Sequence, residues 1–284
     1  MEKYSVLMSV YYRENSLFLK QACDSMLSQT IPPEEFVLVC DGPLTEELNA
    51  VVDEYKQKAP SLFHIVTLPE NKGLAAALNA GLSECSCSWI ARMDSDDIAL
   101  SDRMEKQFAC AARSGAGLLS GTIAEFSCPE GKIRSAEEIA SEIDSLSKRS
   151  LPTEDKKIRR FSRNRNPMNH PAVLMKKEDV LAAGGYDEAY PYFEDYDLWL
   201  RMLKKGVKAA NTEETVLLMR ADAGLYDRRS GKEYRKYMKA FRKRMLREKD
   251  CNLWEYVTSI VTRTVVAWVP SGMRKKFYGT VLRR

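Results

Sequence analysis

The chain has 284 residues, of which 44 are Lys or Arg, 40 are Asp or Glu, and 44% are hydrophobic. This length and balance exclude collagen-like, disordered and polytopic membrane proteins, and they suit one large α/β domain or two smaller ones. The net charge of +4 hides an asymmetry, because residues 1–219 carry −8 and residues 220–284 carry +12. Such a basic C-terminal segment predicts contact with an anionic surface, either a membrane or a nucleic acid.

The first hundred residues alternate between strand-like and helix-like patterns. Strands are predicted at 4–11, 36–40, 63–68 and 89–93, and helices at 16–29, 45–58 and 73–85. This rhythm predicts a mainly parallel sheet with helices on both faces. Because ligands bind beyond the carboxyl ends of such strands, Asp41 and the Asp94–Asp97 cluster are expected at the binding edge.

The rest of the chain is less regular in pattern. A helix is predicted at 101–113, a strand at 116–127, a short strand at 173–175 and a helix at 194–205. Residues 128–167 are polar and weakly periodic, and we expect them to be irregular. Seven scattered cysteines without a CxxC pair, and an N-terminus without a signal-peptide pattern, predict a reducing cytoplasm.

The strongest local signal is the group of Asp94, Asp96 and Asp97 directly after a predicted buried strand. Three carboxylates this close repel one another unless a cation or hydrogen-bond donors compensate. Mg²⁺ or Mn²⁺ suits carboxylate ligands and leaves positions for substrate phosphates. The alternative is a solvated turn before a helix, where Asp is favoured in any case.

Three weaker candidates each have a structural alternative. Asp41, before Gly-Pro, is either a turn former or an acceptor at the sheet edge. Glu194, Asp195 and Asp197 open a helix, where acids favour the dipole, but one of them is also a candidate general base. His170 is either structural or a contact to substrate. GxSxG, GxGxxG and GxxxxGK[ST] motifs are absent, which leaves hydrolase, dinucleotide-binding and P-loop functions without support.

Taken together, these segments resemble family 2 glycosyltransferases with the GT-A fold, over roughly residues 3–220. The resemblance rests on motifs in the family's order: Ser5–Tyr11, Ser25–Thr30, Val39–Gly42, Asn71–Leu74 with Asn79, Ala91–Asp97, Asn169–Pro171, Gly184–Asp187, and Glu194-Asp195 followed by Asp197–Trp199. More narrowly, the chain resembles bacterial capsule, exopolysaccharide and O-antigen transferases that extend a sugar on undecaprenyl diphosphate.

The resemblance implies a role for each matching residue. Asp96 would bind Mn²⁺ or Mg²⁺, and Asp195 would be the catalytic base. Asp41 would contact the uracil or ribose, and Asp94 would lie near the ribose and sugar. Asp97 would support the sugar or the residues around it. Lys72 and Arg92 would lie near the nucleotide. His170 and Glu194 are candidates for contact with the acceptor or a phosphate.

The implied reaction is a single, inverting, metal-dependent transfer from a UDP-hexose such as UDP-galactose to a lipid-linked saccharide. The Gln-x-x-Arg-Trp pattern of processive synthases is absent, which favours transfer of one sugar. The expected domains are a catalytic domain at 1–220, with a nucleotide-sugar half (1–100) and an acceptor half (101–220), and a basic tail at 221–284.

The tail contains two amphipathic segments, at 234–247 and 252–269. The second is shorter than the ~20 apolar residues of a membrane span and is interrupted by Glu255 and Arg263. It fits a helix lying on an anionic membrane. Together with the lipid-linked acceptor that the resemblance implies, this predicts a cytoplasmic protein, peripheral on the inner face of the bacterial cell membrane. The alternative is that both helices pack on the catalytic domain. No nucleic acid partner is expected, because no reader motif is present.

Two other functions remain open from the sequence. The chain is alternatively a membrane-binding scaffold whose acidic cluster is structural, or a nucleotidyltransferase that makes the activated sugar.

Overall fold

The computed structural model describes residues 2–128, 133–221 and 231–268, with side chains up to residue 262. Within these residues a nine-stranded mixed sheet has the order β3-β2-β1-β4-β8-β6-β9-β5, and β7 pairs with β6. The strands are β1 (Tyr4–Val10), β2 (Glu35–Cys40), β3 (Phe63–Thr67), β4 (Trp89–Asp94), β5 (Ile98–Ala99), β6 (Leu118–Phe126), β7 (Ser147–Arg149), β8 (Leu174–Lys176) and β9 (Ala209–Arg220).

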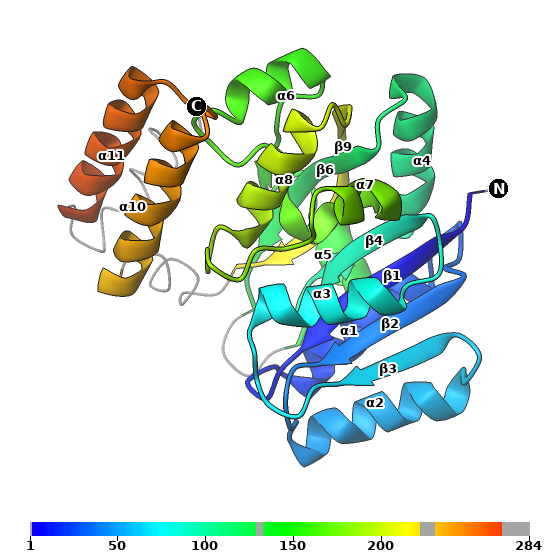
Figure 1. Ribbon diagram of the computed structural model, residues 1–284. Coiled ribbons are helices and arrows are strands. Elements are labelled where there is room, and N and C mark those ends of the chain that lie inside the picture. The colour runs from blue at the N-terminus through cyan, green and yellow to red at the C-terminus, as the bar shows by residue number, and fades with distance from the viewer. Residues whose placement is uncertain (1, 129–132, 222–230, 269–284) are drawn as a thin grey trace.

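The N-terminal half of the sheet is parallel, as the alternating pattern predicts. β1 pairs in parallel with both β2 and β4, and β2 pairs in parallel with β3. β8 then pairs antiparallel with β4 and β6, which makes the sheet mixed. The expected architecture of an α/β sheet flanked by helices is therefore the observed one (Figure 1).

Helices cover both faces of the sheet because alternate strand residues point to opposite sides. Val6 and Met8 of β1 face α1, α2 and α4, whereas Leu7 faces α3, α6, α7 and α8. The helices of the catalytic body are α1 (Ser16–Leu27), α2 (Glu46–Lys58), α3 (Leu74–Glu84), α4 (Arg103–Ser114), α5 (Ala136–Ser141), α6 (Asp155–Phe161), α7 (Lys177–Ala182) and α8 (Glu194–Lys204), with a short 3₁₀ turn at His170–Ala172.

The expectation of an irregular segment at 128–167 is wrong at three short elements, α5, β7 and α6, while residues 129–132 lie outside the described residues. Ser135 and Glu138 form a reciprocal capping box that starts α5. β7 pairs with β6, and α6 buries Ile158 while Arg159 donates to the carbonyl oxygens of Leu203 and Val207. Tertiary contacts, rather than a periodic apolar pattern, stabilise these short elements.

Among the described residues after the body, two helices are present, α10 (Lys232–Arg247) and α11 (Leu253–Trp268). Met238, Phe241 and Met245 of α10 form a buried cluster with Phe193, Tyr196 and Leu200 of the α8 region. Tyr256 and Ile260 of α11 pack against the same cluster. α10 therefore packs on the body, as the structural alternative required. No helix within the described parts of the chain combines the length and apolar character needed to cross a bilayer.

Candidate functional site

Asp41 and Asp94 lie at one edge of the sheet, on either side of β1. Val10 of β1 pairs with Cys40, and Ser9 pairs with Asp94. Since neighbouring strands are about 4.8 Å apart, the two aspartates are separated by roughly 10 Å across the carboxyl ends of three parallel strands. This is the edge at which the sequence predicts a ligand.

Asp41 ties the loop before α3 to this edge. Its carboxylate accepts hydrogen bonds from the backbone amides of Lys72 (2.7 Å) and Gly73 (3.0 Å), and Asn71 donates to its carbonyl oxygen (3.2 Å). Gly42, with φ +82°, allows this approach, because a Cβ there would lie 2.5 Å from the amide nitrogen of Asn71. Each carboxylate oxygen keeps lone-pair capacity for a ligand, and the Lys72 side chain is exposed beside it.

Asp94, Asp96 and Asp97 come together in the turn between β4 and β5. One carboxylate oxygen from each lies within 4.8 Å of the others. Arg220, at the end of β9, holds this turn: its amide donates to Asp97 (2.8 Å) and its Nε donates to the carbonyl oxygen of Asp96 (2.9 Å). The Arg220 guanidinium itself stacks 3.6 Å from the ring centre of Phe18.

The electrostatics of this turn favour a bound cation. Burial, and then the charges of Asp94 and Glu14, raise the pKa of Asp96 to about 7. Burial, followed by the charges of Asp96 and Asp94, also raises the pKa of Asp97 well above its ordinary value. A hard divalent cation would relieve this repulsion, and an all-carboxylate donor set suits Mg²⁺ or Mn²⁺. The residues present therefore fit such an ion.

Arg92 lies in β4, beneath the acidic turn, and is 1% exposed. One of its terminal nitrogens pairs with Asp94, while Nε and Nη1 lack a hydrogen-bond partner in the described part of the chain. Burial acts to lower the pKa of Arg92, but the nearby Asp94 and Tyr186 raise it. These two nitrogens are spare donors for an oxygen-rich ligand. Because unpaired buried donors are costly, such a ligand would stabilise the site.

His170 lies next to Arg92 in an aromatic setting. Its Nε2 is 3.1 Å from the Tyr186 hydroxyl, and its ring centre is 5.9 Å from that of Trp199. Burial, and then the positive charge of Arg92, hold the pKa of His170 well below its usual range. A neutral imidazole is thus expected at physiological pH, which suits hydrogen bonding better than charge pairing with a phosphate.

Glu194 and Asp195 begin α8. Glu194 is 8% exposed, and burial, followed by the charge of Asp195, raises its pKa to about 7. The charges of Arg92 and Asp94 also act on Glu194, which links α8 electrostatically to the sheet edge. Asp195 is half-buried, and its carboxylate accepts hydrogen bonds from Asn166 Nδ2 (2.5 Å) and the Tyr196 amide (2.6 Å).

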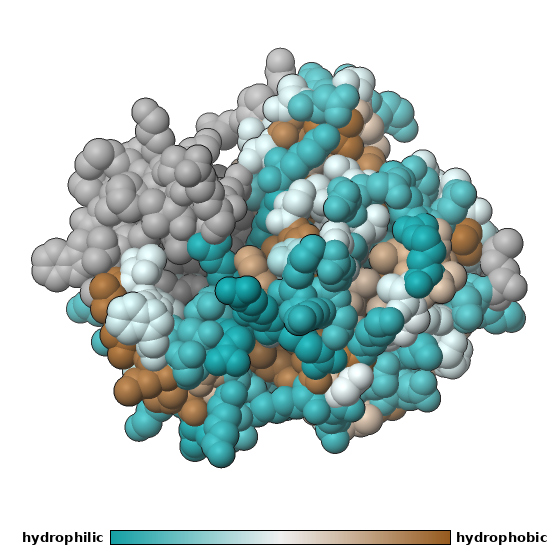
Figure 2. All heavy atoms as spheres, turned by 90° about the horizontal axis from the view of Figure 1, so that it is seen from above, coloured by the Kyte–Doolittle hydropathy of each residue, from teal (hydrophilic) through white to brown (hydrophobic). Residues whose placement is uncertain are grey.

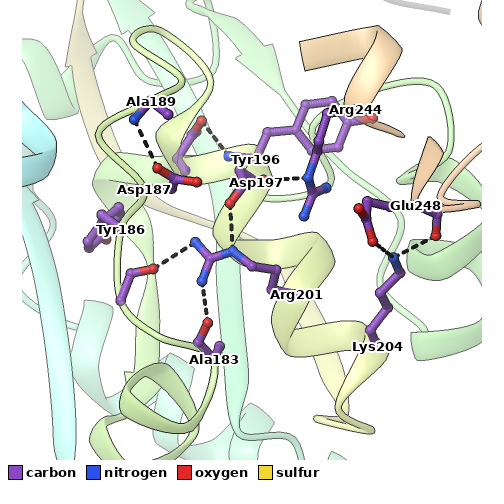
Figure 3. Close-up of polar contacts among 12 residues, drawn as sticks. Ala183, Tyr186, Asp187, Ala189, Tyr196, Asp197, Arg201, Lys204, Arg244 and Glu248 are labelled. Atoms are coloured by element: carbon purple, nitrogen blue, oxygen red, sulfur yellow. Dashed lines mark hydrogen bonds and ion pairs between the residues drawn. The ribbon is translucent and has the colours of Figure 1, made fainter. Parts of the chain in front are cut away.

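The start of α8 is held by a set of polar contacts that includes α10 (Figure 3). Asp197 is buried between Arg201 Nε (2.6 Å) and Arg244 Nε of α10 (3.0 Å). Arg201 also donates to the carbonyl oxygens of Ala183 and Gly185, in the turn that carries Tyr186. Asp197, one of the three acids predicted at this helix start, therefore has a structural role.

Two residues of the site, Arg220 and Asn166, are not among those predicted from the sequence. Arg220 contacts Asp97 from 123 positions away, and Asn166 contacts Asp195 from 29 positions away. Neither residue lies in a local pattern that indicates its partner. The Asn-Pro pair at 166–167, close to the motif at Asn169–Pro171, is the one local signal that points to Asn166.

The chain is similar to a known protein family, to named bacterial proteins and to solved structures. A family model described as "Glycosyl transferase family 2" matches residues 5–181. The chain is 33% identical over 283 residues to the UDP-Gal:alpha-D-GlcNAc-diphosphoundecaprenol beta-1,3-galactosyltransferase of Escherichia coli, covering 99% of this chain and 97% of that one. It is 38% identical over 232 residues to the amylovoran biosynthesis glycosyltransferase AmsE of Erwinia amylovora, covering 81% of each.

A solved structure with the same fold is the mannosyltransferase PcManGT from Pyrobaculum calidifontis, in complex with GDP-Man and Mn²⁺. The TM-score is 0.64 at 16% identity, over 86% of this chain. The chain spans 64% of the length of that protein.

Proposed function

We propose that this chain, which belongs to glycosyl transferase family 2, transfers a single hexose from a UDP-sugar to a lipid-linked saccharide in bacterial surface polysaccharide synthesis. The observation that carries the proposal is the pairing of an acidic turn at the strand ends with a second pair of acids at the start of α8. The name of the Escherichia coli relative supports UDP-galactose as donor and an undecaprenyl-diphosphate acceptor.

Donor binding is assigned to the sheet edge. Asp41 and Lys72 would contact the uracil or ribose, Asp94 and Asp97 the ribose and sugar side, and the spare donors of Arg92 the diphosphate or sugar oxygens. Asp96 would hold Mn²⁺ or Mg²⁺ together with the oxygens of the diphosphate. When bound, the cation supplies charge stabilisation for the departing diphosphate.

The chain's own residues carry the proton in the transfer. Asp195 accepts the proton of the acceptor hydroxyl as its oxygen bonds to the anomeric carbon. The bond from that carbon to the diphosphate breaks in the same displacement, so UDP leaves and the anomeric configuration inverts. Glu194 and His170 would contact the acceptor or a phosphate.

The two halves of the body divide this work. Residues 1–100 would bind the nucleotide sugar and residues 101–220 the acceptor, with residues 221–284 as a separate tail. Because α10 packs on α8, the part of the described tail left to meet a membrane is the outer side of the α10–α11 pair. Residues 222–230 and 269–284 of the expected tail lie outside the described residues.

The exposed side chains of the two helices include apolar and basic ones. On α11, Leu253, Trp254, Val257 and Val261 are exposed, and Trp254 retains 75% exposure. On α10, an exposed row of bases follows helical spacing: Lys232, Lys236, Lys239, Lys243 and Arg247. Figure 2 shows hydrophobic surface at the left of the molecule, where Figure 1 places these helices. Charge complementarity supports an anionic membrane as the partner, with the protein peripheral on its cytoplasmic face.

A transfer assay tests the proposed function. Purified protein is mixed with labelled UDP-galactose, a GlcNAc-diphospho-lipid analogue and Mn²⁺, and matched reactions contain UDP-glucose or excess EDTA. We expect labelled lipid and free UDP, and loss of both products with EDTA. Diphosphate release from UTP and a sugar phosphate, without transfer to lipid, would replace this proposal with nucleotidyl transfer.

A further inference from the structure

Asn166 is fixed at both ends of its side-chain amide. Its Nδ2 donates to Asp195 Oδ2 at 2.5 Å, and its Oδ1 accepts from the Met168 amide at 3.2 Å. Since the amide oxygen is engaged by a backbone N–H, the NH₂ group is the end that faces the carboxylate. The Asn166 side chain is therefore a directed donor to Asp195.

The segment that carries Asn166 is held by α8 and α10. The Tyr196 hydroxyl donates to the carbonyl oxygen of Ser162 (2.6 Å). Arg242 of α10, which is 1% exposed, donates to the carbonyl oxygens of Arg163 (3.3 Å) and Asn164. The Arg242 guanidinium also lies 5.7 Å from the Tyr196 ring centre. The backbone that leads to Asn166 is thus connected to the residue that follows Asp195.

We propose that Asn166 is a positioning residue for Asp195, and that Arg242 of α10 holds the backbone before Asn166 in place. The inference rests on the proposed role of Asp195 as base. A hydrogen bond to a carboxylate is directional, so it restricts rotation of the carboxylate and fixes its orientation. A small displacement of a catalytic group lowers the rate strongly without weakening donor binding. The basic tail therefore contributes to catalysis, apart from any contact with a membrane.

The test separates kcat from KM in variants of Asn166. Loss of a hydrogen bond to a charged group corresponds to about 10–100-fold in rate, so Asn166→Ala should lower kcat by that factor. The KM for the UDP-sugar should stay within about twofold, because the donor contacts lie on the sheet edge. Asn49→Ala is the matched control, and its kcat should match wild type. The Asn49 side-chain amide also donates one hydrogen bond, but to the carbonyl oxygen of Leu44 at the exposed start of α2.

A second variant separates positioning from packing. Asn166→Asp keeps the shape of the side chain but replaces the donor with a like charge, so its kcat should fall at least as far as that of Asn166→Ala. A packing role predicts the reverse order. Wild-type kcat in both Asn166 variants would overturn the inference. If Asp195→Asn is inactive in the same assay, the proposed role of Asp195 as base is unaffected by that result. An active Asp195→Asn would instead remove the proposed base itself.

Arg242→Lys keeps the test decisive if the Asn166 variants do not fold. Lysine retains the charge but cannot bond both carbonyl oxygens in the fork geometry of arginine. We expect kcat to fall while UDP binding and the thermal unfolding midpoint of the UDP complex persist. An unchanged kcat in this variant would contradict the role of α10.

Discussion

At the residue scale, Glu194 at the start of α8 has a raised pKa, and the charge of Asp94 in the acidic turn is the last of its causes. Burial, and then the charge of Asp195, raise its pKa from 4.5 to about 7. Between about pH 4.5 and pH 7, Glu194 keeps its proton in the folded protein but releases it in the unfolded chain. The stability contributed by this proton therefore declines as pH rises from about 4.5 towards 7. The pair at the start of α8 accordingly carries less negative charge below neutral pH.

Glu194→Gln should remove this decline. Glutamine stays neutral, so the variant should gain stability relative to wild type between pH 5 and pH 8, by up to about 3 kcal/mol. Urea unfolding at both pH values, in EDTA, measures the difference. Glu188→Gln, at an exposed position before α8, is the control. An equal pH dependence in wild type and Glu194→Gln would show that Glu194 titrates normally.

At the scale of the elements, a glycine turn lies between α7 and the start of α8. Gly185 has φ +68°, and a Cβ there would lie 2.7 Å from Asn79 Oδ1. Asn79 in turn exchanges two hydrogen bonds of 2.8 Å with the backbone of Tyr186. The turn thereby sets where Tyr186, and with it the surroundings of His170, lie relative to α3.

Gly185→Ala should therefore cost more than backbone strain alone. Gly206→Ala is the matched control, because Gly206 has φ +87° and, among the described residues, nothing lies within 4 Å of where its Cβ would be. The control should lose about 1–2 kcal/mol of unfolding free energy from the left-handed backbone. Gly185→Ala should lose about 1–3 kcal/mol more, since it displaces Asn79 from buried backbone partners. Equal losses in urea unfolding would contradict the role of the Asn79 contact.

The element pattern also explains which parts the sequence could predict. β1 to β4 and their helices follow clear apolar periodicity, and the acidic turn directly follows a buried strand, so both could be placed from the sequence. β9 contains Asn211, Thr212, Glu213 and Glu214, a polar run that does not read as a strand. It forms because β6 and β5 lie on either side of it. Asn166 and Arg220 acquire their partners only through such tertiary pairing.

At the scale of the whole molecule, the acidic body and the basic tail differ in how their charged side chains are placed. The acidic body includes the carboxylates of the candidate site, and the basic tail is not all free surface. Arg242 and Arg244 of α10 are buried against carbonyl oxygens and Asp197, which removes them from any membrane-facing set. The exposed bases of α10 and the apolar row of α11 remain as the proposed membrane surface.

Trp254→Glu should weaken binding to vesicles that contain an anionic lipid, because it places a negative charge in the apolar row. Leu181→Glu is the control, since Leu181 is a 52% exposed apolar residue on α7 of the body. Co-sedimentation with phosphatidylglycerol vesicles, and with phosphatidylcholine vesicles for comparison, measures the effect. We expect several-fold weaker binding for Trp254→Glu alone. Equal binding by wild type and both variants would exclude this surface.

The central claim is that Asp195 takes the acceptor proton at a site where the acidic turn binds the donor. The most direct measurement is kcat for galactose transfer by Asp195→Asn, alongside UDP-galactose affinity in the same preparation. General-base catalysis contributes about 10²–10⁴-fold, so kcat should fall by that factor with donor affinity unchanged. Asp144→Asn, at a 99% exposed side chain, should retain wild-type kcat. Wild-type transfer by Asp195→Asn would contradict the account.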